Sequence, residues 1–322
     1  MQKTYTLFKK YLPIILIVAA LALVFGLITL MTTYNDATMS IDMSQVIPYC
    51  AIFFIVLAIF FVSFLTFKID HLRITKVKKS FGICKFASLL AATLAAASFF
   101  FDFFRFVDQP AQFSAFRIIR LVVFIPFIAY LIINAIPKKI KRKRIVLPSW
   151  LKPICAIATL VWCILGLVMI YFWQSSAYET TMSTVNIFRI AFIFHYILVT
   201  LFFAFEIKFE LLSPVPKAYV FFSGLLFTYS FTVIGPIMLR SILIESNNLG
   251  SISLFEIFLA FALGLYALSK LIAMQQTMRF VMKKNSGGSH HHHRSHRHHH
   301  SKSEGEAVVA ESTEKATEKT EK

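Results

Sequence analysis

LPIILIVAALALVFGLITLMT, residues 12–32 near the N-terminus, is an apolar run in which no side chain carries a charge. As an α-helix it rises 1.5 Å per residue, or about 30 Å in all, which matches the hydrocarbon core of a bilayer. Lipid offers no hydrogen bonds to the backbone, so a run of this length pairs its own amides and carbonyls by forming a helix. The run therefore predicts a membrane-spanning helix.

Seven more stretches of mostly apolar residues follow along the chain, and none shows the short polar–apolar alternation of a barrel strand. The composition agrees, because 57% hydrophobic residues, 15% charged residues and a mean hydropathy of +0.70 lie outside the range of soluble domains. The sequence therefore predicts an all-α integral membrane protein with eight spans, at about 12–32, 46–67, 84–104, 116–136, 151–173, 187–207, 216–239 and 252–274.

Basic residues are spread unevenly over the connections between these spans. The first connection carries Asp36 and Asp42 without a base, whereas the N-terminal segment and the second and fourth connections are rich in Lys and Arg. Basic loops resist translocation, so this pattern predicts a multi-pass cell-membrane protein with both termini in the cytoplasm. The net charge of +17 is then explained by inside-positive loops facing the lipid bilayer and its anionic headgroups, and it indicates no nucleic-acid partner.

The first four spans resemble the last four when the sequence is shifted by about 135 to 143 residues. Gly26 then falls on Gly166, and Arg105 falls on Arg240. Because each half has an even number of spans, the halves would share one orientation and be related by an axis along the membrane normal. A 4+4 parallel repeat is therefore a hypothesis for this chain, and it favours a binding cavity between the halves.

Two features of the spans predict how they pack. Ala91, Ala92 and Ala95 give the third span a small-residue face that permits close approach of a neighbouring helix, which favours a central position. Pro126 in the fourth span removes an amide donor, and so does the Gly235–Pro236 pair in the seventh. Both sites predict a kink or an interruption.

Arginine is the only basic residue at the predicted outer ends of the spans. A guanidinium is planar and always charged, and it grips a carboxylate or a phosphate at two points. In one interpretation the arginines clamp helix ends together by pairing with acids, namely Asp102, Asp108, Glu179, Glu245 and Glu256. In the other they converge on a site for a small anionic solute or a lipid headgroup, and the ligand-binding candidates are Arg105, Arg117, Arg120, Arg189, Arg240, Asp102, Glu256 and His195.

His195 is the only histidine inside a predicted span, and Glu206 follows eleven residues later near the same helical face. The two lie about 16 Å apart along the axis, so they cannot bind one ion directly. Carboxylates are nearly missing from the middle of the spans, which argues against a cation exchanger built on buried acids. The four cysteines lie in or beside the spans without a metal or redox spacing, and we expect them to pack as free thiols.

The sequence changes character after residue 284, so a transmembrane domain of residues 1–284 is followed by a tail of residues 285–322. A Ser- and Gly-rich linker leads into eight histidines, His290, His291, His292, His293, His296, His298, His299 and His300. Imidazoles at this density bind Zn, Ni or Cu with little selectivity, although nothing indicates a required cofactor. Metal buffering, pH-dependent charge and an inert low-complexity run stay open. The Glu- and Lys-rich end is predicted to be disordered, and a cytoplasmic protein partner for it is a hypothesis.

The sequence contains no recognisable catalytic motif: a phosphate-binding Gly-rich loop, HExxH and GxSxG are all missing. The preferred hypothesis is therefore a permease-like transporter of a small, anionic solute. The alternative is a non-transporting sensor or assembly factor that acts through a separate cytoplasmic protein. An intramembrane enzyme acting on lipid headgroups is a minor third hypothesis.

Overall fold

The computed structural model describes residues 2–35, 40–69, 82–108, 115–136, 139–140, 143–144, 148, 150–177, 187–212, 217–244 and 253–287. Its helices are α1 (Gln2–Thr32), α2 (Val46–Lys68), α3 (Gly82–Asp108), α4 (Ala115–Ala135), α5 (Leu151–Ala177), α6 (Ile187–Leu212), α7 (Lys217–Tyr229), η2 (Ser230–Ile234), α8 (Gly235–Leu243) and α9 (Leu254–Gly287). Two antiparallel pairs of very short strands connect some of them, β1 (Tyr34–Asn35) with β2 (Ser40–Ile41) and β3 (Lys139–Ile140) with β4 (Lys143–Arg144).

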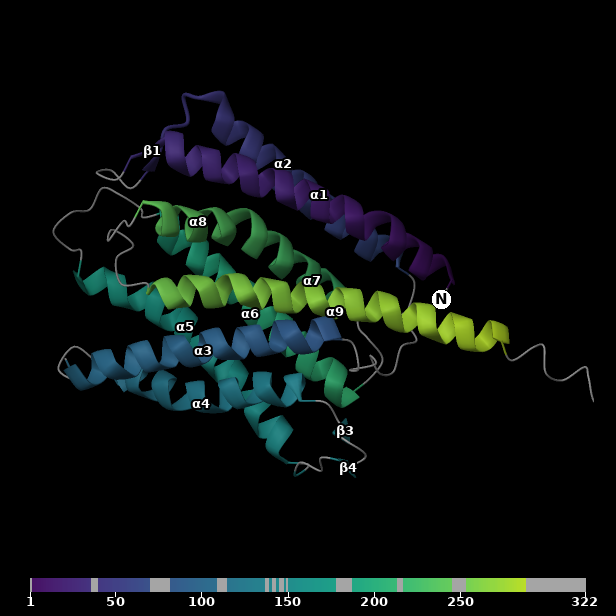
Figure 1. The fold of residues 1–322 in the computed structure, drawn as a ribbon. Coiled ribbons are helices and arrows are strands. Elements are labelled where there is room, and N and C mark those ends of the chain that lie inside the picture. Colours follow the sequence, from purple (N-terminus) through teal and green to yellow (C-terminus); the bar gives the residue numbers. More distant parts are fainter. Residues whose placement is uncertain are drawn as a thin grey trace, which may run out of the picture. The chain divides into compact units, whose positions relative to one another are not determined.

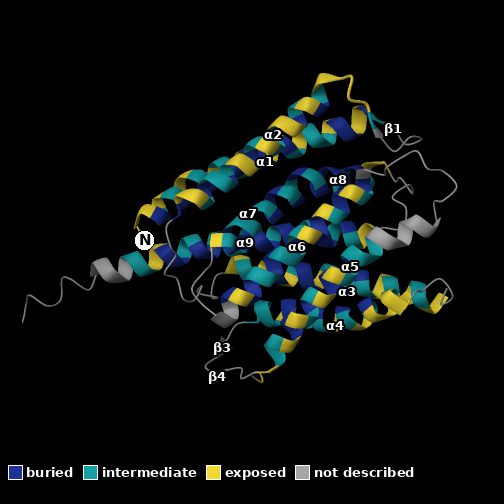
Figure 2. Ribbon diagram, turned by 180° about the vertical axis from the view of Figure 1, so that it is seen from behind, coloured by how far each residue is buried: buried dark blue, intermediate teal, exposed yellow. Residues whose placement is uncertain are grey.

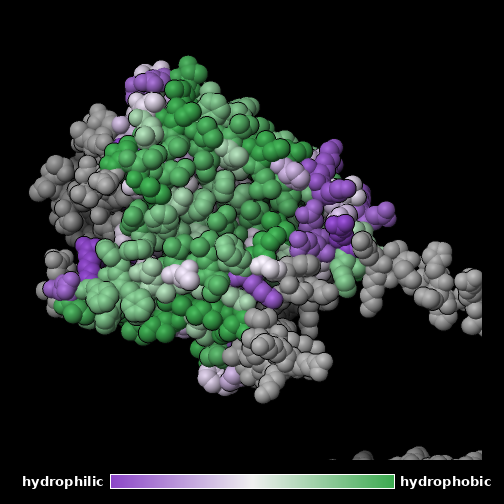
Figure 3. All heavy atoms as spheres, in the orientation of Figure 1, coloured by the Kyte–Doolittle hydropathy of each residue, from purple (hydrophilic) through white to green (hydrophobic). Residues whose placement is uncertain are grey.

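Within the described residues, eight helical segments are long and apolar enough to cross a membrane, and α7, η2 and α8 together form one of them. The eight predicted spans are therefore confirmed as apolar helices. Figure 3 shows apolar side chains covering the flank of the helices, with hydrophilic ones gathered toward the helix ends. A solvent-exposed apolar surface of this extent is costly in water, so the fold supports a multi-pass membrane protein. Orientation and the 4+4 repeat stay predictions.

The helix ends differ most from the predicted span ends in two places. Helix α1 begins at Gln2, ahead of the predicted start at residue 12. Helix α9 continues to Gly287, past the predicted span end at residue 274 and into the predicted tail. The rest of that tail, including the whole histidine run, lies outside the described residues. The metal-binding prediction for the run therefore stays a prediction.

Helix packing divides the bundle into neighbouring layers (Figure 1). Helix α1 packs along α2, and both contact the α7–η2–α8 segment. Helices α3, α4, α5 and α6 pack each against the next. Helix α9 joins these layers, because it contacts α3, α4 and α6 on one side and η2 on the other.

The centre of the bundle lies at α7–α8 and α9 rather than at α3. In the apolar windows of these two segments 67% of the residues are buried, against 33% in α3 (Figure 2). Ala91, Ala92 and Ala95 are buried, as their small size predicts. The prediction that the third helix is central is nevertheless wrong, since a face of small residues fixes how closely one neighbour approaches and not how many helices surround it.

The seventh span is interrupted in the way that Gly235–Pro236 predicts. Proline has no amide to donate to the carbonyl of residue 232, and its ring would collide with that carbonyl in an unbroken α-helix. The chain widens into the π-helical turn η2, where the amide of Gly235 donates to the carbonyl of Ser230. Pro126, by contrast, lies inside α4, which runs as one helix from Ala115 to Ala135.

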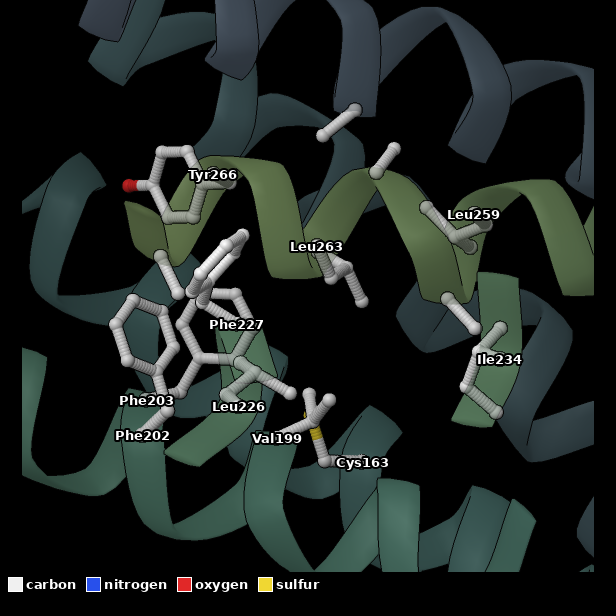
Figure 4. Packing of buried hydrophobic residues seen from close by; sticks show 14 of the residues in the cluster. Cys163, Val199, Phe202, Phe203, Leu226, Phe227, Ile234, Leu259, Leu263 and Tyr266 are labelled. Carbon is white, nitrogen blue, oxygen red and sulfur yellow. The ribbon is translucent and has the colours of Figure 1, made fainter. Parts of the chain in front are cut away.

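Aromatic side chains fill the space between α6, α7 and α9. Figure 4 shows Phe202 and Phe203 of α6, Phe227 of α7 and Tyr266 of α9 in one packed group. Such ring pairs contribute about 0.5–1.5 kcal/mol each beyond their buried area. One position has no room for a side chain at all: a Cβ on Gly264 of α9 would overlap Ser230, so glycine there lets the π turn approach α9 directly.

Candidate functional site

Arg120 of α4 is a buried arginine on which side chains from three other helices converge. Its Nη2 donates to the hydroxyl of Tyr196 on α6 at 2.5 Å and to Oε1 of Glu256 on α9 at 2.8 Å. The Tyr196 hydroxyl in turn donates to the same Oε1 at 2.5 Å. Trp162 of α5 lies under the guanidinium, with 5.1 Å between the guanidinium carbon and the ring centroid. Arg120, Tyr196 and Glu256 are named the Arg120 triad below.

Local sequence explains how Glu256 and Tyr196 reach their positions. Ser253 precedes α9, and its Oγ accepts the amide of Glu256 at 3.1 Å, which caps the first turn of that helix. A carboxylate in the first turn is also favoured by the helix dipole. On α5, a Cβ on Gly166 would lie 2.5 Å from Cε1 of Tyr196, so glycine at this position makes space for the tyrosine ring.

The guanidinium of Arg120 is stabilised by aromatic faces as well as by hydrogen bonds. The Tyr196 ring centroid is 5.5 Å from the guanidinium carbon, on top of the Trp162 contact. Trp162 itself stacks on Phe127, with centroids 4.3 Å apart and planes at 8°. Cation–π contacts of this kind are worth about 2 kcal/mol when they are desolvated. The rings of Trp162 and Tyr196 therefore help to stabilise the charge of Arg120, a residue that is only 7% exposed.

Three further charged residues surround the Arg120 triad. Asp102 of α3 and Arg117 of α4 lie within electrostatic range of each other, of Arg120 and of Glu256, and both lie within range of Arg105 on α3. The fold thus brings together five of the eight ligand-binding candidates, from the three helices α3, α4 and α9. Among the described residues, this group holds three arginines and two carboxylates.

The other three candidates lie elsewhere. Arg240 of α8 donates from Nε to the carbonyl of Leu30 in α1 at 3.2 Å and lies over the ring of Tyr34, 4.4 Å from its centroid. These contacts join α8 to the carbonyl end of α1, where a cation is favoured by the helix dipole. Arg189 is half-buried near the start of α6. Their proposed part in ligand binding stays a prediction.

His195 faces the π turn and not the arginines. Its Nδ1 is 3.5 Å from the hydroxyl oxygen of Ser230, the first residue of η2. The side chain is 1% exposed, and its Nε2 has no hydrogen-bond partner among the described residues. These contacts agree with a packing or cavity histidine. In the described part of the chain, no group of three or more His, Cys, Asp or Glu side chains is placed to hold a metal ion.

A second ionic cluster, which the sequence did not single out as a site, lies farther along α6 and α9. Lys270 of α9 forms an ion pair with Oε1 of Glu206 on α6 at 2.6 Å, and the Tyr266 hydroxyl donates to the same oxygen at 2.9 Å. The ammonium also lies 4.7 Å from the centroid of the Tyr266 ring. Lys270, Tyr266 and Glu206 are named the Lys270 triad below.

The two triads have the same composition and the same spacing. Each holds a cation, a tyrosine and a glutamate, and in each the cation and the phenol both donate to one carboxylate oxygen. The glutamate–tyrosine hydrogen bond joins α6 to α9 across 60 residues in both cases, with the two residue types exchanged. Ten residues separate the triads on each helix, which is about 15 Å.

Several sequence predictions concern residues outside the described ranges. Glu179 and Glu245, which the clamping interpretation pairs with arginines, fall in this group, as do the eight tail histidines. The four cysteines are described and are free thiols, as expected.

The sequence matches no protein-family model, no curated protein and no solved structure.

Proposed function

We propose that this chain is a permease-like membrane protein that moves a small anionic solute, and that Arg120 and Tyr196 bind the solute. One observation carries the proposal: donors from two helices converge on a single, partly buried carboxylate oxygen. The guanidinium N–H of Arg120 and the phenol O–H of Tyr196 point at one position and can bind any anionic oxygen there. These two donors are named the Arg120 cradle below. In the anion-free state Glu256 supplies that oxygen.

The Arg120 cradle has donor capacity that Glu256 does not use. The Nε of Arg120 is buried and has no hydrogen-bond partner among the described residues, and the same holds for Nε1 of Trp162. A buried donor without an acceptor costs about 1–3 kcal/mol. A small carboxylate or phosphate, which has more than one oxygen, can satisfy such donors as well as the cradle. The three arginines of the surrounding group also favour an anion over a cation.

The neighbouring backbone supports a transport role. The π turn η2 interrupts the seventh span and touches both His195 of α6 and Gly264 of α9, the helices that carry Tyr196 and Glu256. Interrupted helices commonly line the binding sites of transporters. Single π turns within α-helices are likewise frequent at functional sites. In the orientation predicted from the basic loops, the Arg120 cradle lies toward the outside and both termini lie in the cytoplasm.

Proteoliposomes that contain the full chain test this proposal with a panel of small organic anions and inorganic phosphate. Tyr196→Phe removes one donor of the cradle and keeps the arginine, so we expect flux of the transported anion to fall about tenfold to a hundredfold, the effect of losing a hydrogen bond to a charged group. Tyr229→Phe is the matched control, because its hydroxyl donates to the backbone carbonyl of Ala191 at 2.9 Å, away from the cradle.

Two results would count against the permease. Equal flux in wild type and Tyr196→Phe would show that the Arg120 cradle does not bind the transported anion. No flux for any anion, with folded protein that still binds an anion, would favour the sensor or assembly role and a separate cytoplasmic partner.

A further inference from the structure

The Lys270 triad buries a full ion pair that the proposed transport site does not use. The Glu206 side chain is 1% exposed and the Lys270 side chain 14% exposed. Burying two opposite charges costs several kcal/mol of lost hydration per ion, so such a pair is weak evidence for a stabilising role alone. Glu206 is also held asymmetrically: Oε1 accepts both donors, whereas Oε2 is buried without a hydrogen-bond partner among the described residues.

We propose that Lys270 and Tyr266 form a second binding site for a small anion, of the same chemical class as the solute at Arg120, and that Glu206 occupies this site while no anion is bound. The inference rests on the proposed function, because it makes the second triad a station on the same route. Lys270 is the more exposed member of the pair, so an anion meets its ammonium before it meets the carboxylate.

The chemistry of the Lys270 triad selects an anion rather than a cation. The ammonium and the phenol hydroxyl both donate to the position of Oε1, so that point attracts negative charge. A metal ion entering there would face Lys270 directly. The resident carboxylate competes with an incoming anion for both donors, so the site holds an anion weakly, as a step in a pathway requires.

The arrangement of the two triads suits two successive anion-binding sites along one transport pathway. Tyr196 and Glu206 lie on α6, and Glu256 and Tyr266 lie on α9, so one helix pair carries both sites about 15 Å apart. A shift between α6 and α9 that opens one glutamate–tyrosine contact also acts on the other. Binding at the two sites is therefore coupled through a shared interface.

Chemical rescue tests the second site without relying on transport. Glu206→Ala removes the resident carboxylate and leaves Lys270 and Tyr266 as donors around an empty space. We expect the variant of the full chain, purified in detergent, to unfold at a lower temperature than wild type. Sodium formate should then raise its unfolding temperature in a saturable way by about 2 °C or more, relative to sodium chloride at equal ionic strength.

Variants that lack a donor give the matched controls for this rescue. Glu206→Ala/Lys270→Met should lose the formate effect, and Glu206→Ala/Tyr266→Phe should weaken it. If Glu206→Ala does not purify as folded protein, Glu206→Ser takes its place, because serine is small enough to leave room for formate. Formate that stabilises none of the Glu206 variants, or stabilises the Lys270→Met double variant equally, overturns the second site.

The rescue also separates this inference from the proposed function. Formate rescue in a protein that transports no anion supports the second site and contradicts the permease. Flux through wild type without any formate rescue leaves the permease in place and overturns the second site.

Discussion

Replacing Arg120 with methionine is expected to abolish anion flux and to lower the free energy of unfolding by about 3–5 kcal/mol. The loss of stability follows because the carboxylate of Glu256, whose side chain is 14% exposed, loses the guanidinium that pairs with it directly at 2.8 Å. Tyr196 remains as a donor to the carboxylate, but one neutral hydroxyl does not replace a guanidinium. Unfolding in mixed micelles measures the stability, and proteoliposome flux measures the function.

The double variant Arg120→Met/Glu256→Gln separates the two effects. It contains no unpaired charge in the triad, so we expect it to recover most of the stability that Arg120→Met loses. Flux should stay lost, because the cationic half of the cradle is missing. A double variant that transports at the wild-type rate would show that Arg120 serves the fold only, and a single variant with wild-type stability would show that Glu256 does not depend on it.

Lys270→Met should cost a similar 3–5 kcal/mol, because it leaves the carboxylate of Glu206 unbalanced at 1% exposure. Glu206→Gln/Lys270→Met should regain most of this loss, which gives a large coupling energy in a double-mutant cycle. Lys208→Met is the matched control: this lysine lies two residues beyond Glu206 on the same helix and is exposed, so its loss should change stability by no more than about 0.5 kcal/mol.

The double-mutant cycle of Glu206 and Lys270 can also show that these two residues do not form a buried ion pair. Equal, small effects of Lys270→Met and Lys208→Met would mean that Glu206 is hydrated in the membrane-embedded protein. Additive effects of the two substitutions in the triad would mean that Glu206 and Lys270 do not interact.

Much of the fold could be predicted because lipid imposes simple rules on sequence. An uncharged run such as residues 12–32 has one stable form in a bilayer, and Gly235–Pro236 marks the place where a helix cannot continue unchanged. The central position of α9 could not be predicted in the same way. Its neighbours α3, α4 and α6 are distant in sequence, and the sequence of α9 does not indicate which helices pack against it.

The candidate site was predictable in part for a related reason. The restriction of the predicted outer ends to arginine indicated paired guanidinium groups, and three of the five arginines do come together with Asp102 and Glu256. Tyr196 and Trp162 were missed, because an aromatic residue in an apolar span has the same pattern whether it packs against lipid or binds a cation. Arg240 has the same residue type and a similar predicted depth, yet it donates to the Leu30 carbonyl of α1, since depth along a helix does not specify which neighbour a side chain meets.

The most direct test of anion binding at Arg120 uses the emission of Trp162, whose ring centroid is 5.1 Å from the guanidinium carbon. The chain has three tryptophans, so Trp150→Phe/Trp173→Phe leaves Trp162 as the reporter. We expect a saturable change in Trp162 emission as the transported anion is added, because the anion displaces Glu256 and shifts the guanidinium over the ring. The change should be missing when Arg120→Met/Glu256→Gln is added. Emission that stays constant at saturating anion, in protein that still transports that anion, would contradict the account.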